Sequence, residues 1–235
     1  MEAGAAREPM RGETVADTVA TATTTADPGP LGLAAFALTT FVLSMINSQL
    51  VGEASVPVVL GLALAYGGLA QLLAGMWEFR TGNTFGATAF TSYGAFWLSF
   101  WAFEQFFAKE VPPAHLGDTV GLFLIAWGIF TTYMWIASLR TTAAISLVFI
   151  LLAATFIILG IGNAQNDANI VKIGGYVGLA TAAAAWYASF AVVVNSTFGR
   201  TVMPVFPLKR EPRVRATSRR QVAVDQRSGQ SIAQR

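Results

Sequence analysis

Apolar residues fill six long stretches of the chain, and polar residues are gathered between and beyond these stretches. Each stretch is close to the ~20 residues with which a helix crosses the hydrocarbon core of a bilayer. Several connections are only a few residues long, so neighbouring helices must run antiparallel. We therefore expect an all-α integral membrane protein with six transmembrane helices, at residues 31–52, 56–77, 86–107, 119–139, 142–162 and 173–194.

The two ends of the chain lack this apolar pattern. Residues 1–26 are rich in Ala, Thr and Glu and cannot bury enough apolar surface to fold, so we expect a disordered N-terminal tail. They also lack the apolar core of a secretory signal peptide. Residues 205–235 are polar and basic, and we expect a second disordered tail there. The transmembrane domain then covers residues 27–204.

The placement of charge agrees with a membrane protein. Only 12% of the residues are charged, about half the share of an average soluble domain. The few charged residues between Leu31 and Val194 fall at or near the ends of the apolar stretches, where a charge is least costly. With six spans, thirteen of the fifteen Lys and Arg residues lie on the side of the two termini. The positive-inside rule therefore predicts a multi-pass protein of the plasma (inner) membrane with both termini in the cytoplasm.

The available residue types exclude several kinds of chemistry. The chain has no cysteine and a single histidine, His115, so we expect no disulfide framework and no metal site built on thiolates or imidazoles. It has no Ser–His–Asp set and no phosphate-binding loop, and we expect neither an enzyme nor a cofactor nor a nucleic-acid partner. The expected surroundings are a lipid bilayer. A membrane enzyme and a non-transporting sensor or scaffold remain as alternatives.

Polar side chains recur at helical spacing within the apolar stretches. Such side chains normally face the interior of a bundle or a water-filled path. For a single Thr or Ser, a bond to its own helix backbone is the simpler explanation, whereas the amides of Gln71 and Asn47 favour a lining role. Because these recurring polar side chains are uncharged, they suit a small, weakly bound anion or a neutral solute such as ammonia. The candidate lining residues are Thr40, Asn47, Gln71, Thr88, Thr91, Ser92 and Asn163.

Three segments resemble a known family. The heptapeptide Asp27-Pro28-Gly29-Pro30-Leu31-Gly32-Leu33 is similar to the Asn-Pro-Ala-Pro-Leu-Gly-Leu signature of the acetate uptake transporter family, the acetate/succinate permeases of bacteria and their fungal relatives. Residues 71–97 contain Gly-Asn-Thr-Phe-Gly and Phe-Thr-Ser-Tyr-Gly, which resemble the family's most characteristic block. Residues 198–204 resemble its closing stretch. The signature departs from the family at two positions, because Asp27 stands for Asn and Gly29 for Ala.

The resemblance implies a transporter of acetate and related short carboxylates, including succinate, with one pore in each subunit of a cyclic hexamer. Transport would be channel-like or proton-coupled. The resemblance also implies an apolar constriction in the pore. By this resemblance, the residues of the constriction correspond to Phe36, Tyr93 and Leu152, with Leu151 as the alternative to Leu152. An apolar ring of this kind can gate by dewetting.

The prolines of the signature predict the start of the first helix. Proline is favoured in the first turn of a helix, where no backbone N–H is needed, and Asp27 stands where an N-cap residue would. The free N–H groups of this helix start would attract an anion weakly. A carboxylate at Asp27 would oppose that attraction unless it is used in capping.

Overall fold

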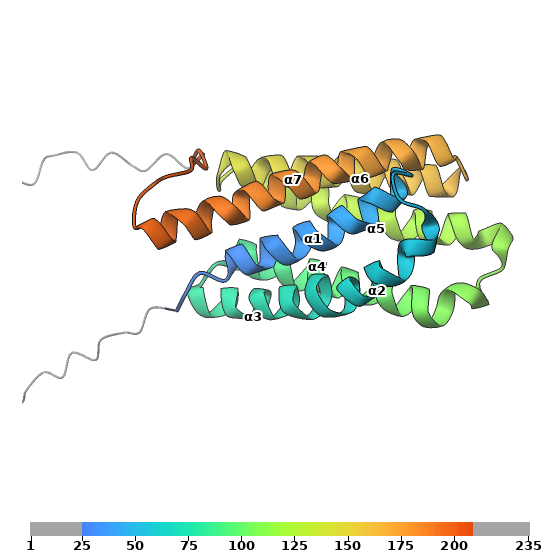
Figure 1. The fold of residues 1–235 in the computed structure, drawn as a ribbon, viewed down its shortest axis with the longest axis horizontal. Helices are drawn as coiled ribbons and strands as arrows, with labels where there is room; N and C mark the ends of the chain where they lie inside the picture. Colours follow the sequence, from blue (N-terminus) through green and yellow to red (C-terminus); the bar gives the residue numbers. More distant parts are fainter. Residues whose placement is uncertain (1–24, 209–235) are drawn as a thin grey trace, which may run out of the picture.

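The computed structural model describes residues 25–208, which form a bundle of long helices (Figure 1). Helices α2 and α3 belong to one rod, because the π-helical turn η2 joins them without a break. The bundle therefore has six rods, and the expected six-helix architecture is confirmed. The elements are α1 (Gly29–Asn47), η1 (Glu53–Ser55), α2 (Val56–Leu64), η2 (Ala65–Ala70), α3 (Gln71–Thr81), α4 (Thr84–Ala102), η3 (Phe103–Phe107), η4 (Ala108–Glu110), α5 (Pro113–Ser138), α6 (Ala143–Ala164) and α7 (Ala168–Phe198).

Five of the rods are long and apolar enough to cross a membrane. They are α1, the rod from Glu53 to Thr81, α5, α6 and α7. Helix α4 is the exception, since threonines and serines interrupt its apolar residues. Three of these hydroxyl residues, Thr88, Thr91 and Ser92, are half-buried in the bundle. The rod that is not apolar enough to meet this criterion thus carries three of the seven candidate lining residues, more than any other rod.

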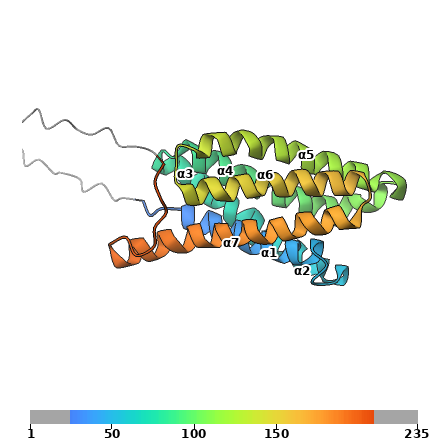
Figure 2. The ribbon, with the colours of Figure 1, turned by 90° about the horizontal axis from the view of Figure 1, so that it is seen from above.

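The rods run roughly along one common axis (Figures 1 and 2). Helix α1 packs on α7, α7 on α6, α6 on α5, and α3 on α4. Both ends of the described chain lie at the same end of the bundle, on the left in Figure 1. An even number of crossings requires this. We call it the terminal end of the bundle.

Glycines allow the rods to approach one another closely. A Cβ added at Gly174 of α7 would lie 2.6 Å from the Leu159 side chain of α6, and one at Gly94 of α4 would lie 2.7 Å from Leu72 of α3. Without an aqueous driving force between helices, such close backbone packing is what holds membrane bundles together. The small residues of this chain therefore serve packing.

The rod of α2 and α3 contains a feature that the sequence did not predict. In η2 the backbone widens for one π-helical turn, which changes the faces on which the following residues lie. Gly67 sits in this turn, and a Cβ there would lie 2.6 Å from the Thr39 hydroxyl oxygen of α1. The turn brings the rod against α1 and leads directly into Gln71.

Capping groups fix the ends of the helices at the terminal end. The Asp27 carboxylate accepts a hydrogen bond of 2.8 Å from the Gly29 N–H, while Pro28 occupies the N-cap position expected for Asp27. The Asp27 carboxylate is therefore bonded to the first turn of α1. Asp27 itself lies one residue before the N-cap position, where the sequence had placed it at that position. Helix α3 ends at Gly82, whose φ of 75° suits glycine. The Asn83 side chain then accepts from the Gly86 N–H at 3.1 Å and starts α4.

The chain after α7 returns to the bundle. We call residues 201–208 the strap. Phe206 accepts a hydrogen bond of 2.8 Å from the Ala143 N–H, and the Leu208 N–H donates to Thr141 at 2.9 Å. Residues 205–208 were expected to belong to a disordered tail, and in the structure backbone bonds tie them to the start of α6. The remainder of both predicted tails, 1–24 and 209–235, lies outside the described residues.

Candidate functional site

Three large side chains from three different helices meet inside the bundle. Phe36 of α1, Tyr93 of α4 and Leu152 of α6 are 5%, 3% and 3% exposed and belong to one apolar cluster. The ring centroids of Phe36 and Tyr93 are 5.8 Å apart. Leu151 is only half-buried, so Leu152 is the better candidate of the two. The residues expected to form a constriction are thus brought together, and we call them the inner ring.

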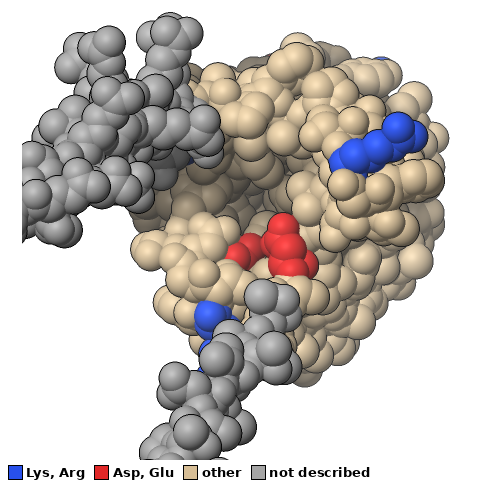
Figure 3. Space-filling view, turned by 90° about the vertical axis from the view of Figure 1, so that its left-hand side faces the viewer, with Lys and Arg blue, Asp and Glu red and all other residues tan. Residues whose placement is uncertain are grey.

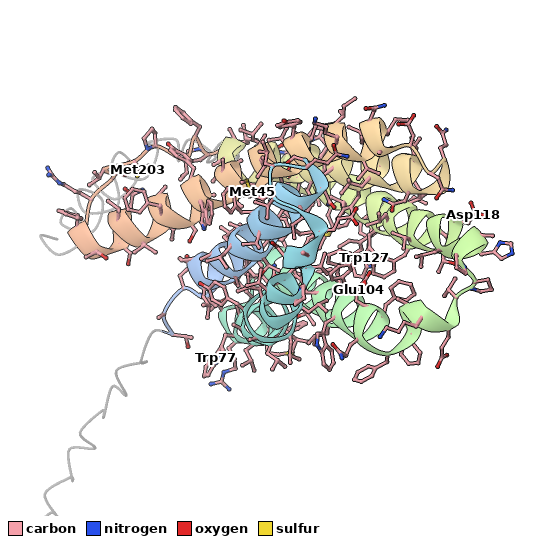
Figure 4. All side chains as sticks on the ribbon, turned by 45° about the vertical axis from the view of Figure 1, so that its right-hand side comes forward. Met45, Trp77, Glu104, Asp118, Trp127 and Met203 are labelled. Atoms are coloured by element: carbon pink, nitrogen blue, oxygen red, sulfur yellow. The ribbon has the colours of Figure 1, made fainter. Side chains whose placement is uncertain are left out.

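Tyr93 is held in place by helix α5. Its hydroxyl donates a hydrogen bond of 3.0 Å to the Thr131 hydroxyl, which in turn donates to the Trp127 carbonyl at 2.7 Å. The Phe130 ring packs edge-on at 5.4 Å, and Trp127 lies inside the bundle beside it (Figure 4). The sequence analysis missed Thr131 and this aromatic collar. A lone hydroxyl and scattered rings in an apolar stretch carry no distinctive pattern.

Four buried polar atoms have no hydrogen-bond partner within residues 25–208. A buried polar group without a partner costs free energy, so such groups are rare unless water or a ligand satisfies them. All four residues come from α1, α3 and α4, and two of these helices also carry Phe36 and Tyr93. The atoms are Thr40 Oγ1, Gln71 Oε1, Thr91 Oγ1 and Trp97 Nε1.

Gln71 stands out within this set. Its side chain is 1% exposed, although it carries an amide with four hydrogen-bonding positions. Its neighbour Leu72 packs against Gly94 of α4, the residue after Tyr93, so Gln71 lies at the level of the inner ring. Gln71, Thr40 and Thr91 were candidates from the sequence, whereas Trp97 was not.

Other predicted lining residues are engaged elsewhere. The Asn163 amide donates to the Leu159 carbonyl of its own helix at 2.8 Å, which makes its expected lining role unnecessary. Asn47, Thr88 and Ser92 are half-buried. Towards the two ends of α4, the polar side chains of Thr84 and Ser99 are exposed.

Two carboxylates lie close together at the terminal end. A Cβ added at Gly29 would lie 2.9 Å from Asp27 Oδ1 and 3.5 Å from Glu78 Oε1. Glu78 is 2% exposed and accepts a hydrogen bond of 3.1 Å from the Thr81 hydroxyl. Figure 3 shows acidic side chains beside a hollow in this face.

No group of three or more His, Cys, Asp or Glu side chains that could hold a metal ion occurs among the described residues. The site therefore consists of an apolar ring, uncharged polar groups beside it, and two carboxylates at one end.

The sequence profile of the GPR1/FUN34/yaaH family matches residues 12–210. The chain belongs to this family. It is 44% identical over 206 residues to acetate permease A of Emericella nidulans, covering 81% of this chain and 69% of that protein. It is 39% identical over 181 residues to the succinate-acetate/proton symporter SatP of Escherichia coli K12, covering 77% of this chain and 95% of that protein.

A third relative carries a different name. The chain is 42% identical over 175 residues to ammonia transport outward protein 2 of Saccharomyces cerevisiae, covering 72% of this chain and 62% of that protein. Among solved structures, that of the bacterial acetate channel SatP matches with a TM-score of 0.73 at 38% identity, covering 77% of this chain and 99% of that one. The fold of the family's acetate channel is therefore the fold of this protein.

Proposed function

We propose that this protein carries acetate and related short carboxylates, succinate among them, across a membrane through a path between its helices. The observation that carries the proposal is the set of buried polar groups of Thr40, Gln71, Thr91 and Trp97 that have no partner within the described residues. The hydroxyls, the indole N–H and the NH2 group of the Gln71 amide can donate to a carboxylate without holding it permanently, while the unpartnered Gln71 atom itself, Oε1, is an acceptor. Relatives named for acetate and succinate transport support the choice of solute.

In this proposal the inner ring is the barrier. Phe36, Tyr93 and Leu152 offer no hydrogen bond along the path except through the Tyr93 hydroxyl, which is engaged by Thr131. A water column breaks easily at such an apolar constriction, so the ring resists ions until it is wetted or widened. The polar groups next to it partly replace the hydration shell that the carboxylate loses on approach.

Flux of labelled acetate into proteoliposomes tests this proposal. With an imposed pH gradient, we expect uptake far above that of protein-free vesicles. An uncoupler distinguishes the two modes of transport: uptake that collapses with the gradient indicates proton coupling, and uptake that follows only the acetate gradient indicates a channel. Absence of acetate uptake by folded protein would contradict the proposal.

Transport of ammonia is the second candidate, because one relative is named for it and the lining groups are uncharged. Ammonia is neutral, so its path would not need hydrogen-bond donors that receive a carboxylate. Measuring ammonia and acetate flux in the same vesicles decides between the two. Ammonia flux that exceeds acetate flux and is insensitive to competing acetate would favour the second candidate.

We also propose that the terminal end faces the cytoplasm and that the protein lies in the plasma membrane. The distribution of Lys and Arg supports this orientation. Single cysteines are informative because the chain has none. Cysteines at Ser55 and His115 should react with an impermeant thiol reagent from outside, and one at Ser218 should not. The reverse pattern would contradict the orientation.

A cyclic hexamer with one path in each subunit is the assembly that we propose. Large apolar side chains of α7, among them Ile173, Phe190 and Phe198, face outward and are available to lipid or to a neighbouring subunit. Native mass spectrometry in mild detergent should detect six copies. A stable monomer that transports acetate would contradict this assembly.

A further inference from the structure

A second set of apolar side chains lies between the inner ring and the terminal end. Leu33 precedes Phe36 by three residues on α1, and Phe90 precedes Tyr93 by three residues on α4. Residues three, four or seven apart lie on the same face of a helix. Since α1 and α4 both begin at the terminal end, Leu33 and Phe90 lie one turn closer to it than the inner ring does.

Helix α6 contributes a third member to this set. Ile145 lies seven residues before Leu152, on the same face and two turns closer to the terminal end. It packs both against the cluster of the inner ring and against the cluster that contains Leu33. Phe90 reaches α1 as well, because a Cβ added at Gly32 would lie 2.6 Å from its ring. We call Leu33, Phe90 and Ile145 the outer ring.

The strap places one side chain on the outer ring. Val205 packs against the cluster formed by Leu33, Ala144 and Ala188, in which Phe90 and Ile145 also take part. Leu33, Ala144 and Ala188 come from α1, α6 and α7. The side chain of Val205 thus lies against the cluster where these three helices meet, on the terminal side of the inner ring.

The strap is held by a small number of hydrogen bonds. The α6 start is bonded to it through the Ala143 N–H to Phe206 at 2.8 Å, the Ala144 N–H to Val205 at 3.4 Å, and the Leu208 N–H to Thr141 at 2.9 Å. The strap residues themselves are exposed or half-buried. Backbone groups that open at a surface find water as a replacement partner, so local release of such a segment is much easier than unfolding of the bundle.

Helix α7 fixes the other end of the strap. The Asn195 side chain accepts from the Val202 and Met203 N–H groups at 2.7 and 2.9 Å and donates to the Met203 carbonyl at 2.8 Å. The Tyr187 hydroxyl donates to the Pro204 carbonyl at 2.6 Å. Only the part from Val205 onward depends on α6. The strap therefore has a fixed root on α7 and a releasable end on the outer ring.

We propose that the strap is a gate at the terminal end of the path, with Val205 as its plug and the outer ring as its seat. This proposal rests on the proposed function, since a gate requires a transported solute. With Val205 seated, an aliphatic side chain completes an apolar barrier. Release of the strap from α6 withdraws that side chain and opens the way from the terminal end to the inner ring. A solute then has to pass two apolar barriers, the inner ring and the outer ring closed by Val205. Only the barrier at the outer ring includes a movable segment, the strap.

A disulfide can lock this gate. Thr142 and Pro207 are partners in an antiparallel bridge, which brings their backbones close enough for a cross-link. The variant Thr142→Cys/Pro207→Cys contains the only two cysteines of the chain. Acetate flux is measured in the same proteoliposomes after oxidation and again after reduction with dithiothreitol, with thiol labelling to count the cross-linked fraction.

The gate predicts that oxidation lowers acetate flux by at least about threefold and that reduction restores it, as for other mobile segments that limit turnover. The variant Thr142→Cys alone, which also loses the cap on the Ile145 N–H, should respond to neither reagent. Val205→Ala, a second arm, should raise flux several-fold. Equal flux in the oxidised and reduced double variant, or unchanged flux in Val205→Ala, would overturn the gate. Absence of acetate flux in the unaltered protein would instead refute the proposed function.

Discussion

Two groups of buried polar side chains occupy the two halves of the bundle, and their bonding differs. On α5, α6 and α7, each buried threonine bonds a carbonyl of its own helix, and Thr155 and Thr181 also contact one another at 3.1 Å. On α1, α3 and α4, buried polar atoms of Thr40, Gln71 and Thr91 have no partner within the described residues. The first group is complete without a solute and serves packing. The second group lacks partners within the described residues, and it is the group that we propose to line the path.

Neighbouring residues on α1 show the same difference at the smallest scale. The Thr39 hydroxyl donates to the Ala35 carbonyl at 2.9 Å and lies against Gly67. The Thr40 hydroxyl is equally buried and makes no bond. Both residues have the same side chain and the same helical backbone, so residue type alone does not decide the role. The role depends instead on the side of the helix on which the hydroxyl lies.

The largest effect is expected at Gln71. Replacing its amide by the apolar side chain in Gln71→Leu removes the bonds offered to a passing carboxylate. One hydrogen bond of ~1.5 kcal/mol to a charged carboxylate corresponds to a loss of acetate flux of roughly tenfold. Asn163→Leu is the matched control, because that amide is already bonded to Leu159. It should leave flux nearly unchanged. Equal losses in both variants would show that the difference between the two groups has no functional meaning.

A smaller effect is expected for the hydroxyl groups. Thr40→Val keeps the shape of the side chain and removes only its hydroxyl, so flux should fall by about two- to fivefold. Thr181→Val removes a hydroxyl that bonds the Val177 carbonyl and should affect thermal stability rather than flux. Measuring both quantities on the same preparations checks the assignment. A larger loss of flux in Thr181→Val would reverse it.

The smallest effect is expected at Tyr93. Tyr93→Phe keeps the ring and removes only the bond to Thr131, so the protein should lose ~1 kcal/mol of stability and little flux. Because the two hydroxyls act as a pair, adding Thr131→Val should cost less in the double variant than on its own. Thermal unfolding of the four proteins in detergent measures this coupling. Additive losses would mean that the bond does not position the ring.

The sequence was sufficient for the architecture, whereas the site residues that it suggested stay predictions. Six apolar stretches of the right length leave few alternatives to six rods, and the family resemblance assigned the inner ring, whose residues do come together. The π-helical turn η2 could not be predicted, because a single widened turn depends on packing against α1 and leaves no periodic signal. Thus the faces of the polar residues could only be approximated.

The misses share a physical cause. Whether Asn163 bonds its own helix or faces the path depends on its rotamer, and the sequence does not contain it. Trp97 reads as an apolar residue because its single polar atom is outnumbered by carbon, although that N–H is buried without a partner in the described part of the chain. Residues 205–208 of the strap were assigned to a disordered tail from their composition. Its order comes from backbone groups at the start of α6, which accept and donate regardless of residue type.

The proposed function requires that the inner ring is the barrier in a carboxylate path. The most direct test is the ratio of lactate to acetate uptake, normalised to folded protein, in Phe36→Ala beside Phe156→Ala. Both rings are buried in the same cluster, but Phe156 packs edge-on against Phe96 at 5.1 Å and lies outside the ring. Phe36→Ala should raise the ratio several-fold by widening the constriction. Phe156→Ala should leave the ratio unchanged and lower only the yield of folded protein, because a large-to-small change in the core costs a few kcal/mol of stability. An unchanged ratio in folded Phe36→Ala would contradict the account.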